Sequence, residues 1–196
     1  MMMSKIFVAC DSTNIRKVKE IIKKTTNPKL KVGYKFGLEF LNSKNGRNFL
    51  SKLKNKILFA DLKLNDIPNT CVSTIKAVKD LKVNYLTIHI SSGLKALVSA
   101  KKVSGRTKLV GVTVLTSLDN KALKQIGHKN NVKKLVLQQA KLASKAKLDA
   151  IVCSAQEIEI VKKVFKKEII TPGIRINKNN DDQKRTLTPN QAYKNG

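Results

Sequence analysis

The chain has 196 residues, of which 41% are hydrophobic and 5% aromatic, and its formal net charge is +27. This length suits one domain, residues 1–196, with a sizeable core, and the composition is that of an ordinary globular α/β protein. No run of 18 or more residues is apolar, and the apolar stretch near the start is too short for a signal peptide. We therefore expect no membrane span and no membrane partner.

The cysteines, Cys10, Cys71 and Cys153, are odd in number and form no C-x-x-C pair. This pattern is typical of reduced thiols in a cytoplasmic protein, and it argues against a disulfide framework or a zinc site. We therefore expect a cytoplasmic location and no bound metal at the cysteines.

The positive charge raises the alternative of a non-enzymatic nucleic-acid-binding protein. Only five of the 40 basic residues are arginine, however, and the lysines are spread along the whole chain without a basic tail. Arginine is the residue favoured for bidentate phosphate and base contacts, and aromatic residues for base stacking are scarce here. A solvated lysine-rich surface, with no nucleic-acid partner, is the favoured interpretation.

Strand-like apolar runs alternate with helical patterns along the chain. We predict strands at 6–10, 31–36, 57–60, 84–88, 108–114, 150–153 and 169–171. We predict helices at 15–24 (with Ser12 or Thr13 as its cap), 46–53, 69–81, 94–102 and 156–165, a long helical stretch with 132–146 at its core, and a short helical start at 189–193. The alternation indicates parallel βαβ units, and seven of them favour a (β/α)₈ TIM barrel over an open doubly wound sheet. No G-x-G-x-x-G follows the first strand, which weakens a dinucleotide-binding interpretation.

A barrel places its chemistry where strands end and loops begin. The polar residues at those points are Asp11, Lys35, Asp61, Lys63, Asp66, His89, Thr116, Ser117, Ser154, Arg175 and Gln183. We expect them to form a ring around one mouth of the barrel.

The most informative segment is D-x-K-x-x-D, formed by Asp61, Lys63 and Asp66 directly after the predicted strand 57–60. Pro68 then stands where a helix could begin. A lysine between carboxylates competes with a metal ion for their charge and is kept protonated, so a salt-linked array with a proton-donating lysine is favoured over a Mg²⁺ site. A surface ion-pair cluster at a helix start is the structural alternative.

The two histidines do not suggest a nucleophilic triad. His128 lies in a polar stretch and is expected to face solvent, and His89, at the end of a strand, is interpreted as a structural histidine. A phosphate site is suggested later in the chain, because Arg175 and Gln183 follow the seventh predicted strand, and such loops often hold phosphate in barrels. A loop salt bridge is the alternative for Arg175.

Four segments in this order resemble the orotidine 5'-phosphate decarboxylase family: DLKLNDIPNT at 61–70, VTVLTS at 112–117, VCSAQE at 152–157 and TPGIR at 171–175. The resemblance runs from Val8 to the end of the chain. It implies decarboxylation of orotidine 5'-phosphate to UMP in pyrimidine biosynthesis, by electrostatic stabilisation of a C6 carbanion and its protonation by Lys63, without cofactor or metal.

The resemblance also implies roles for single positions. Lys35, Asp61, Lys63 and Asp66 resemble the catalytic array, and Asp11 resembles the residue that holds the ribose hydroxyls. The other substrate-binding positions that it implies are Ile67, Thr70, Thr116, Ser154, Pro172, Arg175 and Gln183. Asp66, Ile67 and Thr70 would reach into the site of a partner subunit, which implies a homodimer.

The second-strand lysine is ambiguous, because both Lys31 and Lys35 stand in a K-x-G pattern. Lys35 is preferred, since Glu39 and an apolar residue follow it as in the family.

The family's eighth strand ends in a Gly-Arg pair that grips the phosphate, and no such segment precedes the last residue, Gly196. We therefore expect a barrel truncated before its eighth strand, and reduced or no activity for these 196 residues alone. A Mg²⁺-dependent sugar-phosphate decarboxylase or aldolase of the same barrel group remains the enzymatic alternative.

Overall fold

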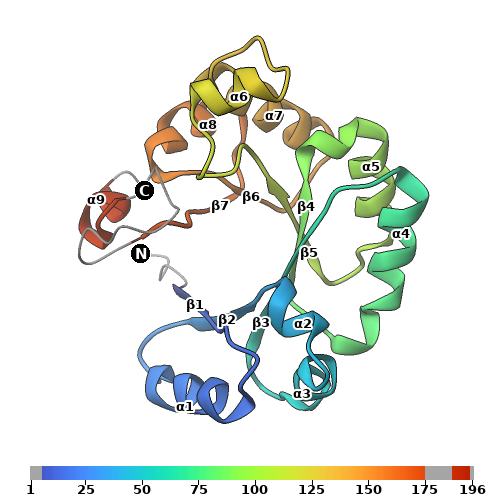
Figure 1. The fold of residues 1–196 in the computed structure, drawn as a ribbon, viewed down its shortest axis with the longest axis vertical. Helices are drawn as coiled ribbons and strands as arrows, with labels where there is room; N and C mark the ends of the chain where they lie inside the picture. Colours follow the sequence, from blue (N-terminus) through green and yellow to red (C-terminus); the bar gives the residue numbers. More distant parts are fainter. Residues whose placement is uncertain (1–5, 175–186, 195–196) are drawn as a thin grey trace.

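The computed structural model describes residues 6–174 and 187–194. Its seven strands are β1 (Ile6–Ala9), β2 (Val32–Phe36), β3 (Ile57–Leu64), β4 (Tyr85–His89), β5 (Lys108–Val112), β6 (Ala150–Val152) and β7 (Glu168–Ile170). They form one sheet in sequential order, and every neighbouring pair is parallel. The sheet is curled, so that β1 and β7, its two edges, come to the same side of the molecule (Figure 1).

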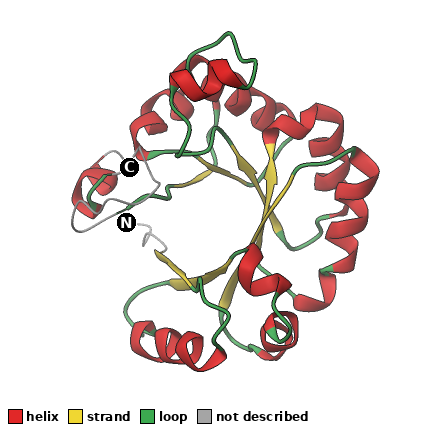
Figure 2. Cartoon of the chain, viewed as in Figure 1, coloured by secondary structure: helices red, strands yellow, loops and turns green. Residues whose placement is uncertain are grey.

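The helices follow the strands and surround the curled sheet (Figure 2). They are α1 (Ile15–Thr25), α2 (Leu38–Asn42), α3 (Gly46–Lys52), α4 (Pro68–Ala77), α5 (Gly93–Val103), α6 (Asn120–Gln125), α7 (Val132–Lys145), α8 (Ile158–Val164) and α9 (Pro189–Lys194). Short 3₁₀ turns lie at Lys79–Leu81 (η1), Ile90–Ser92 (η2) and Ala155–Glu157 (η3). None of the helices in the described ranges has the length and apolar character needed to cross a membrane.

The predicted alternation is confirmed, with differences in local detail. Helix α1 is capped by Asn14, whose side chain accepts hydrogen bonds from the backbone N–H groups of Arg16 and Lys17, so the prediction of Ser12 or Thr13 as cap is wrong. Pro68 does begin α4, as its fixed φ angle and missing N–H allow. Helix α2 was not predicted, and α6 was not separated from the long helical stretch expected around 132–146, because five or six residues are too few to show a helical period.

The core has two parts. One lies between the sheet and the helices and contains large buried side chains such as Phe36, Phe40 and Leu50. The other fills the interior of the curled sheet, where the ring of Phe7 meets those of Phe59 and Tyr85 edge-on, each at 5.1 Å between ring centroids. This second layer closes one end of the interior with apolar side chains.

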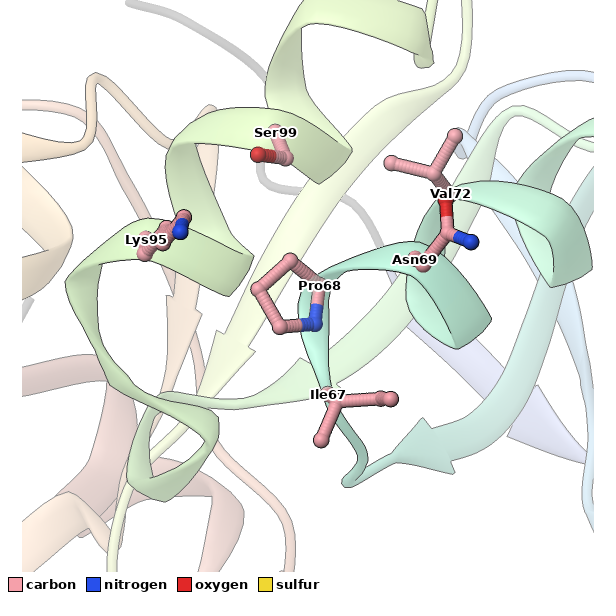
Figure 3. A pocket seen from close by; sticks show the side chains of 6 residues that line it. All are labelled: Ile67, Pro68, Asn69, Val72, Lys95 and Ser99. Atoms are coloured by element: carbon pink, nitrogen blue, oxygen red, sulfur yellow. The ribbon is translucent and has the colours of Figure 1, made fainter.

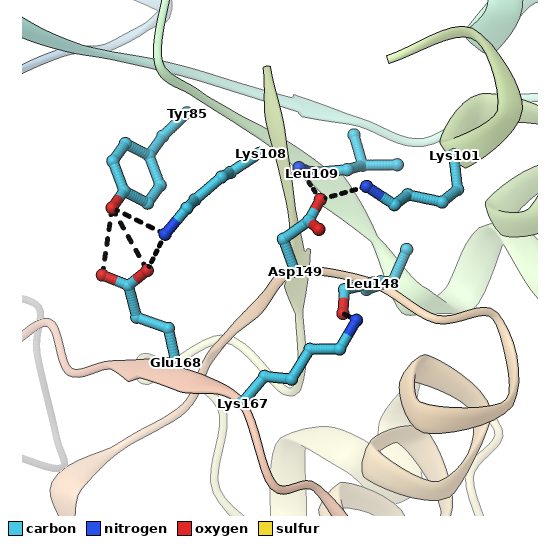
Figure 4. Close-up of polar contacts among 8 residues, drawn as sticks. All are labelled: Tyr85, Lys101, Lys108, Leu109, Leu148, Asp149, Lys167 and Glu168. Atoms are coloured by element: carbon cyan, nitrogen blue, oxygen red, sulfur yellow. Dashed lines mark hydrogen bonds and ion pairs between the residues drawn. The ribbon is translucent and has the colours of Figure 1, made fainter. Parts of the chain in front are cut away.

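A polar network ties the first residues of three strands together at that end (Figure 4). The Glu168 carboxylate on β7 accepts hydrogen bonds from the Tyr85 hydroxyl on β4, at 3.0 and 3.1 Å, and from Lys108 Nζ on β5, at 2.8 Å. Each of these residues is the first of its strand. The network therefore joins the strands at the end opposite to their carboxyl ends.

Candidate active site

A polar layer follows the apolar layer along the same inner face of the sheet. Side chains of a strand alternate between faces, so the residue two positions further along shares the face. Asp61 follows Phe59 on β3 in this way, and Thr87 follows Tyr85 on β4. This places both polar groups toward the carboxyl ends of the strands, which is where barrel enzymes carry their catalytic residues.

Strand β3 is longer and less regular than predicted. It continues from Ala60 to Leu64, and its pairing with β4 shifts between these two residues. At this bulge Lys63 has a φ angle of +47°, in the left-handed region that non-glycine residues rarely adopt. Such conformations persist only where the surroundings hold them, and they cluster at functional sites.

Four charged side chains from three neighbouring strand ends form a chain of alternating charge. Lys63 Nζ lies 2.8 Å from Asp61 Oδ2, and Lys35 Nζ lies 3.5 Å from the same oxygen. Lys35 Nζ also lies 3.4 Å from Oδ1 of Asp11, which follows β1. The structure thus brings together Asp11, Lys35, Asp61 and Lys63, an arrangement that can stabilise negative charge developing beside the lysines.

The ambiguity between the two candidate lysines of the second strand has a geometric answer. Lys35 lies inside β2 and points to Asp61, whereas Lys31 precedes the strand and is exposed. The backbone carbonyl of Lys31 accepts a hydrogen bond from Ile6, the first residue of β1, so Lys31 is at the opposite end of the sheet from the charged array.

Thr87 belongs to the same array and was missed in the sequence. Its hydroxyl donates a hydrogen bond to Asp61 Oδ1 at 3.0 Å and accepts one from the backbone N–H of Lys63 at 2.8 Å. The one available signal was its position, two residues after Tyr85 and two before His89 on a predicted strand.

The environment of Asp61 favours its ionised form. Burial alone would raise the pKa of this carboxyl group, because a charge is costly to remove from water. The hydrogen bond and charge of Lys63, the charge of Lys35 and the hydrogen bond from Thr87 outweigh this cost, so the pKa lies below its ordinary value. Asp61 is therefore an anion at neutral pH although it is buried.

Two neighbouring groups are kept uncharged. Burial lowers the pKa of His89, at the end of β4, and the positive charge of Lys63 lowers it further, with Asp61 opposing both effects. Burial and Asp11 raise the pKa of the Cys10 thiol to about 11, against the charge of Lys35. Both groups are therefore in their neutral forms at neutral pH.

Asp66 does not join the array within its own chain. Its side chain is exposed, and its Oδ1 accepts a hydrogen bond from the backbone N–H of Ile67 at 2.7 Å. Ile67 itself is 66% exposed. Ile67 and Pro68 line a pocket between the start of α4 and the side of α5, together with Asn69, Val72, Lys95 and Ser99 (Figure 3).

The remaining predicted residues lie in the loops after later strands. Thr116 and Ser154 are buried and follow β5 and β6, and the Ser154 hydroxyl accepts a hydrogen bond from the backbone N–H of Gln156. Pro172 is half-buried after β7, and Thr70 is exposed in the first turn of α4. Arg175 and Gln183 lie outside the described residues.

The sequence from residue 4 to residue 196 matches the family described as "Orotidine 5'-phosphate decarboxylase / HUMPS family". The chain belongs to this family. It is 43% identical to an orotidine 5'-phosphate decarboxylase of Wolbachia pipientis subsp. Culex pipiens, an alignment that covers 99% of this chain and 87% of the relative. It is 39% identical to the enzyme of that name from Prochlorococcus marinus strain MIT 9515, over 98% and 85% of the two chains.

A solved relative of the orotidine 5'-phosphate decarboxylase family also shares the fold. The crystal structure of the Lactobacillus acidophilus enzyme superposes with a TM-score of 0.83 at 30% identity, covering 98% of this chain and 86% of the other. Together with the seven sequential parallel strands, this confirms the predicted (β/α) barrel.

Proposed function

We propose that this chain is one barrel domain that decarboxylates orotidine 5'-phosphate to UMP, with Lys63 as the proton donor to C6. The observation that carries the proposal is the alternating array, in which Lys63 Nζ is held 2.8 Å from a buried, ionised Asp61. Relatives named for this reaction, at 39–43% identity over nearly the whole chain, support the same assignment.

The reaction breaks the bond between C6 of the pyrimidine and its carboxylate. Carbon dioxide leaves without the bonding electron pair, which stays on C6 as a carbanion. The Lys63 ammonium stabilises this charge as it develops, and then gives a proton to C6, so that a C6–H bond forms and the lysine becomes a neutral amine. The Lys63 side chain is 38% exposed, so solvent can return the proton. The net change is uptake of one proton and release of one CO₂.

Asp61 and Lys35 position Lys63. The Asp61 carboxylate fixes the direction of the Lys63 ammonium, and Lys35 links Asp61 to Asp11 across β2. Asp61 would also lie near the departing carboxylate, where its negative charge would disfavour the ground state. No metal or cofactor enters these steps.

Substrate binding is assigned from the family resemblance. Asp11 would hold the ribose hydroxyls, and Ser154 would contact the pyrimidine. Arg175 and Gln183 would lie near the phosphate, and Thr116 and Pro172 are further substrate-binding positions. Binding energy from the remote phosphate would hold the ring beside Lys63.

A homodimer completes the proposed site. Asp66, Ile67 and Thr70 of one subunit would reach the partner's array. The exposed Asp66 carboxylate, which accepts a hydrogen bond from the backbone of Ile67 and not from Lys63 of its own chain, supports this arrangement. The pocket that Ile67 lines supports it too, because the Ile67 side chain is two-thirds exposed. An apolar side chain exposed beside a pocket is the kind of surface that a partner subunit covers.

A cytoplasmic location also belongs to the proposal. All three cysteines are free and buried, which suits a reducing compartment.

The direct test is the loss of ultraviolet absorbance of orotidine 5'-phosphate when purified protein is added. We expect UMP as product, with a rate that a chelator such as EDTA does not change. Loss of the activity on chelation would favour the Mg²⁺-dependent sugar-phosphate alternative. Salt-sensitive binding of generic RNA without decarboxylation would favour the nucleic-acid alternative.

A further inference from the structure

Thr87 occupies the one position of β4 that faces the bulge of β3. Ala60 pairs with Leu86 and Leu64 pairs with Ile88. Three residues of β3, 61–63, therefore stand opposite a single residue of β4, which is Thr87. Because the ladder is interrupted here, the backbone groups of the bulge need partners other than the β4 backbone.

The Thr87 hydroxyl supplies partners to both ends of this bulge. It accepts a hydrogen bond from the backbone N–H of Lys63 at 2.8 Å, and its single O–H donates a hydrogen bond to Asp61 Oδ1 at 3.0 Å. Thr87 is 1% exposed, so water does not replace either bond. The buried Thr87 hydroxyl thus links two groups. One is the backbone of Lys63, which is in the left-handed region, and the other is the Asp61 carboxylate, which also binds the Lys63 ammonium.

The two bonds have different consequences. The bond to Lys63 N–H supports a backbone conformation that a lysine does not adopt without help. The bond to Oδ1 fixes the rotation of the Asp61 carboxylate, so that Oδ2 faces both Lys63 Nζ and Lys35 Nζ. Without the hydroxyl, the carboxylate could turn and the lysine backbone could relax.

We propose that Thr87 is a positioning residue, which acts through Asp61 and Lys63 and makes no contact with the substrate. This inference rests on the proposed function, since it assigns Thr87 to the same reaction. The relevant property is its hydroxyl and not its volume, so valine, which has the same shape without the hydroxyl, is the informative replacement.

The experiment compares Thr87→Val, Thr87→Ser and a matched control, Thr113→Val. Thr113 is also a buried threonine, and its hydroxyl donates to the Val152 backbone carbonyl at 2.8 Å rather than to a member of the charged array. Thr87→Val should lower kcat about 10- to 100-fold with little change in KM, as expected when a buried hydrogen bond to a charged group is lost. Thr87→Ser should stay within about 3-fold of the parent because it keeps the hydroxyl. Thr113→Val should keep the parental kcat.

A second readout uses the ionisation of Asp61. The groups that face Asp61 are Lys63 on β3, Lys35 on β2, and Thr87 and His89 on β4. Thr87→Val removes a hydrogen bond that lowers the pKa of Asp61, and it frees the carboxylate to turn from the two lysines, whose charges also lower that pKa. The pKa of Asp61, read from carbon-13 NMR of labelled carboxylates, and the acidic limb of the kcat/KM profile should therefore both move to higher pH.

The outcomes separate this inference from the proposed function. Parent protein that is folded but does not convert orotidine 5'-phosphate would overturn the function, and the NMR titration would still decide the role of Thr87. An unchanged Asp61 pKa in Thr87→Val, or a serine variant as impaired as the valine variant, would overturn the inference. If Thr87→Val does not fold, the kcat and the Asp61 pKa of Thr87→Ala are measured instead and compared with those of Thr113→Ala.

Discussion

Lys35 and Lys63 bind the same oxygen of one carboxylate. The Nζ atom of Lys63 lies 2.8 Å from Asp61 Oδ2, and that of Lys35 lies 3.5 Å from it. Because both cations share this anion, the position of each depends on Asp61. The two lysines come from neighbouring strands, β2 and β3, and together they hold the Asp61 carboxylate between them.

The second-strand lysine is tested by comparing Lys35→Ala with Lys31→Ala. Removing Lys35 takes one of two cations from Asp61 and breaks the link to Asp11, so kcat should fall by about 100-fold or more, in the range found when a preorganised charge is lost from a site. Lys31 is exposed beyond the other end of β2, so Lys31→Ala should retain parental kcat and KM. Equal loss in both variants, measured by steady-state kinetics, would contradict the assignment of Lys35.

The ionisation of Asp61 should make the stability of the fold depend on pH. The pKa of Asp61 is lowered in the folded state, whereas in the unfolded chain its pKa has the ordinary value of about 3.9. Ionised Asp61 therefore stabilises the folded state above the unfolded pKa, and this contribution is lost as the pH falls through the folded pKa. The free energy of unfolding by urea should decline less steeply below about pH 5 in Asp61→Asn than in the parent.

Glu20→Gln is the control for that titration. The pKa of Glu20 is also lowered, by its hydrogen bond to Lys24, but the pair is on the solvent-exposed side of α1. Exposed pairs contribute little to stability, so Glu20→Gln should follow the parental curve closely. A parental slope in Asp61→Asn would show that Asp61 does not carry the predicted dependence.

The shared-site arrangement is tested by mixing two inactive subunits. Lys63→Ala and Asp66→Ala should each be nearly inactive as homodimers. If Asp66 serves the partner's site, each mixed dimer has one site with both residues intact, and random mixing should restore about a quarter of the parental activity. If Asp66 serves its own chain, every site in the mixture lacks one of the two residues. No recovery in subunits shown by light scattering to be mixed dimers would contradict the proposal.

The network at the other end of the barrel should affect stability and leave the chemistry alone. Glu168→Gln weakens the bonds from Tyr85 and Lys108 that join β4, β5 and β7 (Figure 4). We expect a loss of about 1 kcal/mol in the free energy of unfolding, at the lower end for hydrogen bonds to a charged group, because Glu168 and Lys108 are only partly buried. The kcat for orotidine 5'-phosphate should stay near the parental value, and a fall in kcat with unchanged stability would contradict this division of roles.

Much of the fold follows from local sequence patterns. The seven strands are short apolar runs and the long helices have a clear period, so both were predictable. Strand β3 was predicted to end at Ala60, where the apolar run ends. It continues through Asp61 and Lys63, and inward charged side chains are tolerated in a strand only when the charges are paired. The pairing with Lys35 supplies that condition, and it depends on a residue 26 positions away in the chain.

The site was less predictable than the fold for the same reason. Asp11, Lys35, Asp61 and Lys63 could be placed at strand ends, and the barrel brings them together. Thr87 could not be selected, because its role comes from facing the bulge of β3, and a bulge has no local signal in the sequence. Asp66 is close to Lys63 in sequence, but the start of α4 turns its side chain away from the array.

The most direct test of the account replaces Lys63 with alanine and measures turnover and binding separately. If Lys63 gives the proton to C6, Lys63→Ala should convert orotidine 5'-phosphate at least about 1,000-fold more slowly than the parent, because both charge stabilisation and proton transfer are lost. Its affinity for UMP, measured by calorimetry, should fall far less, since UMP has no carbanion to stabilise. Near-parental turnover by a folded Lys63→Ala variant would contradict the central claim.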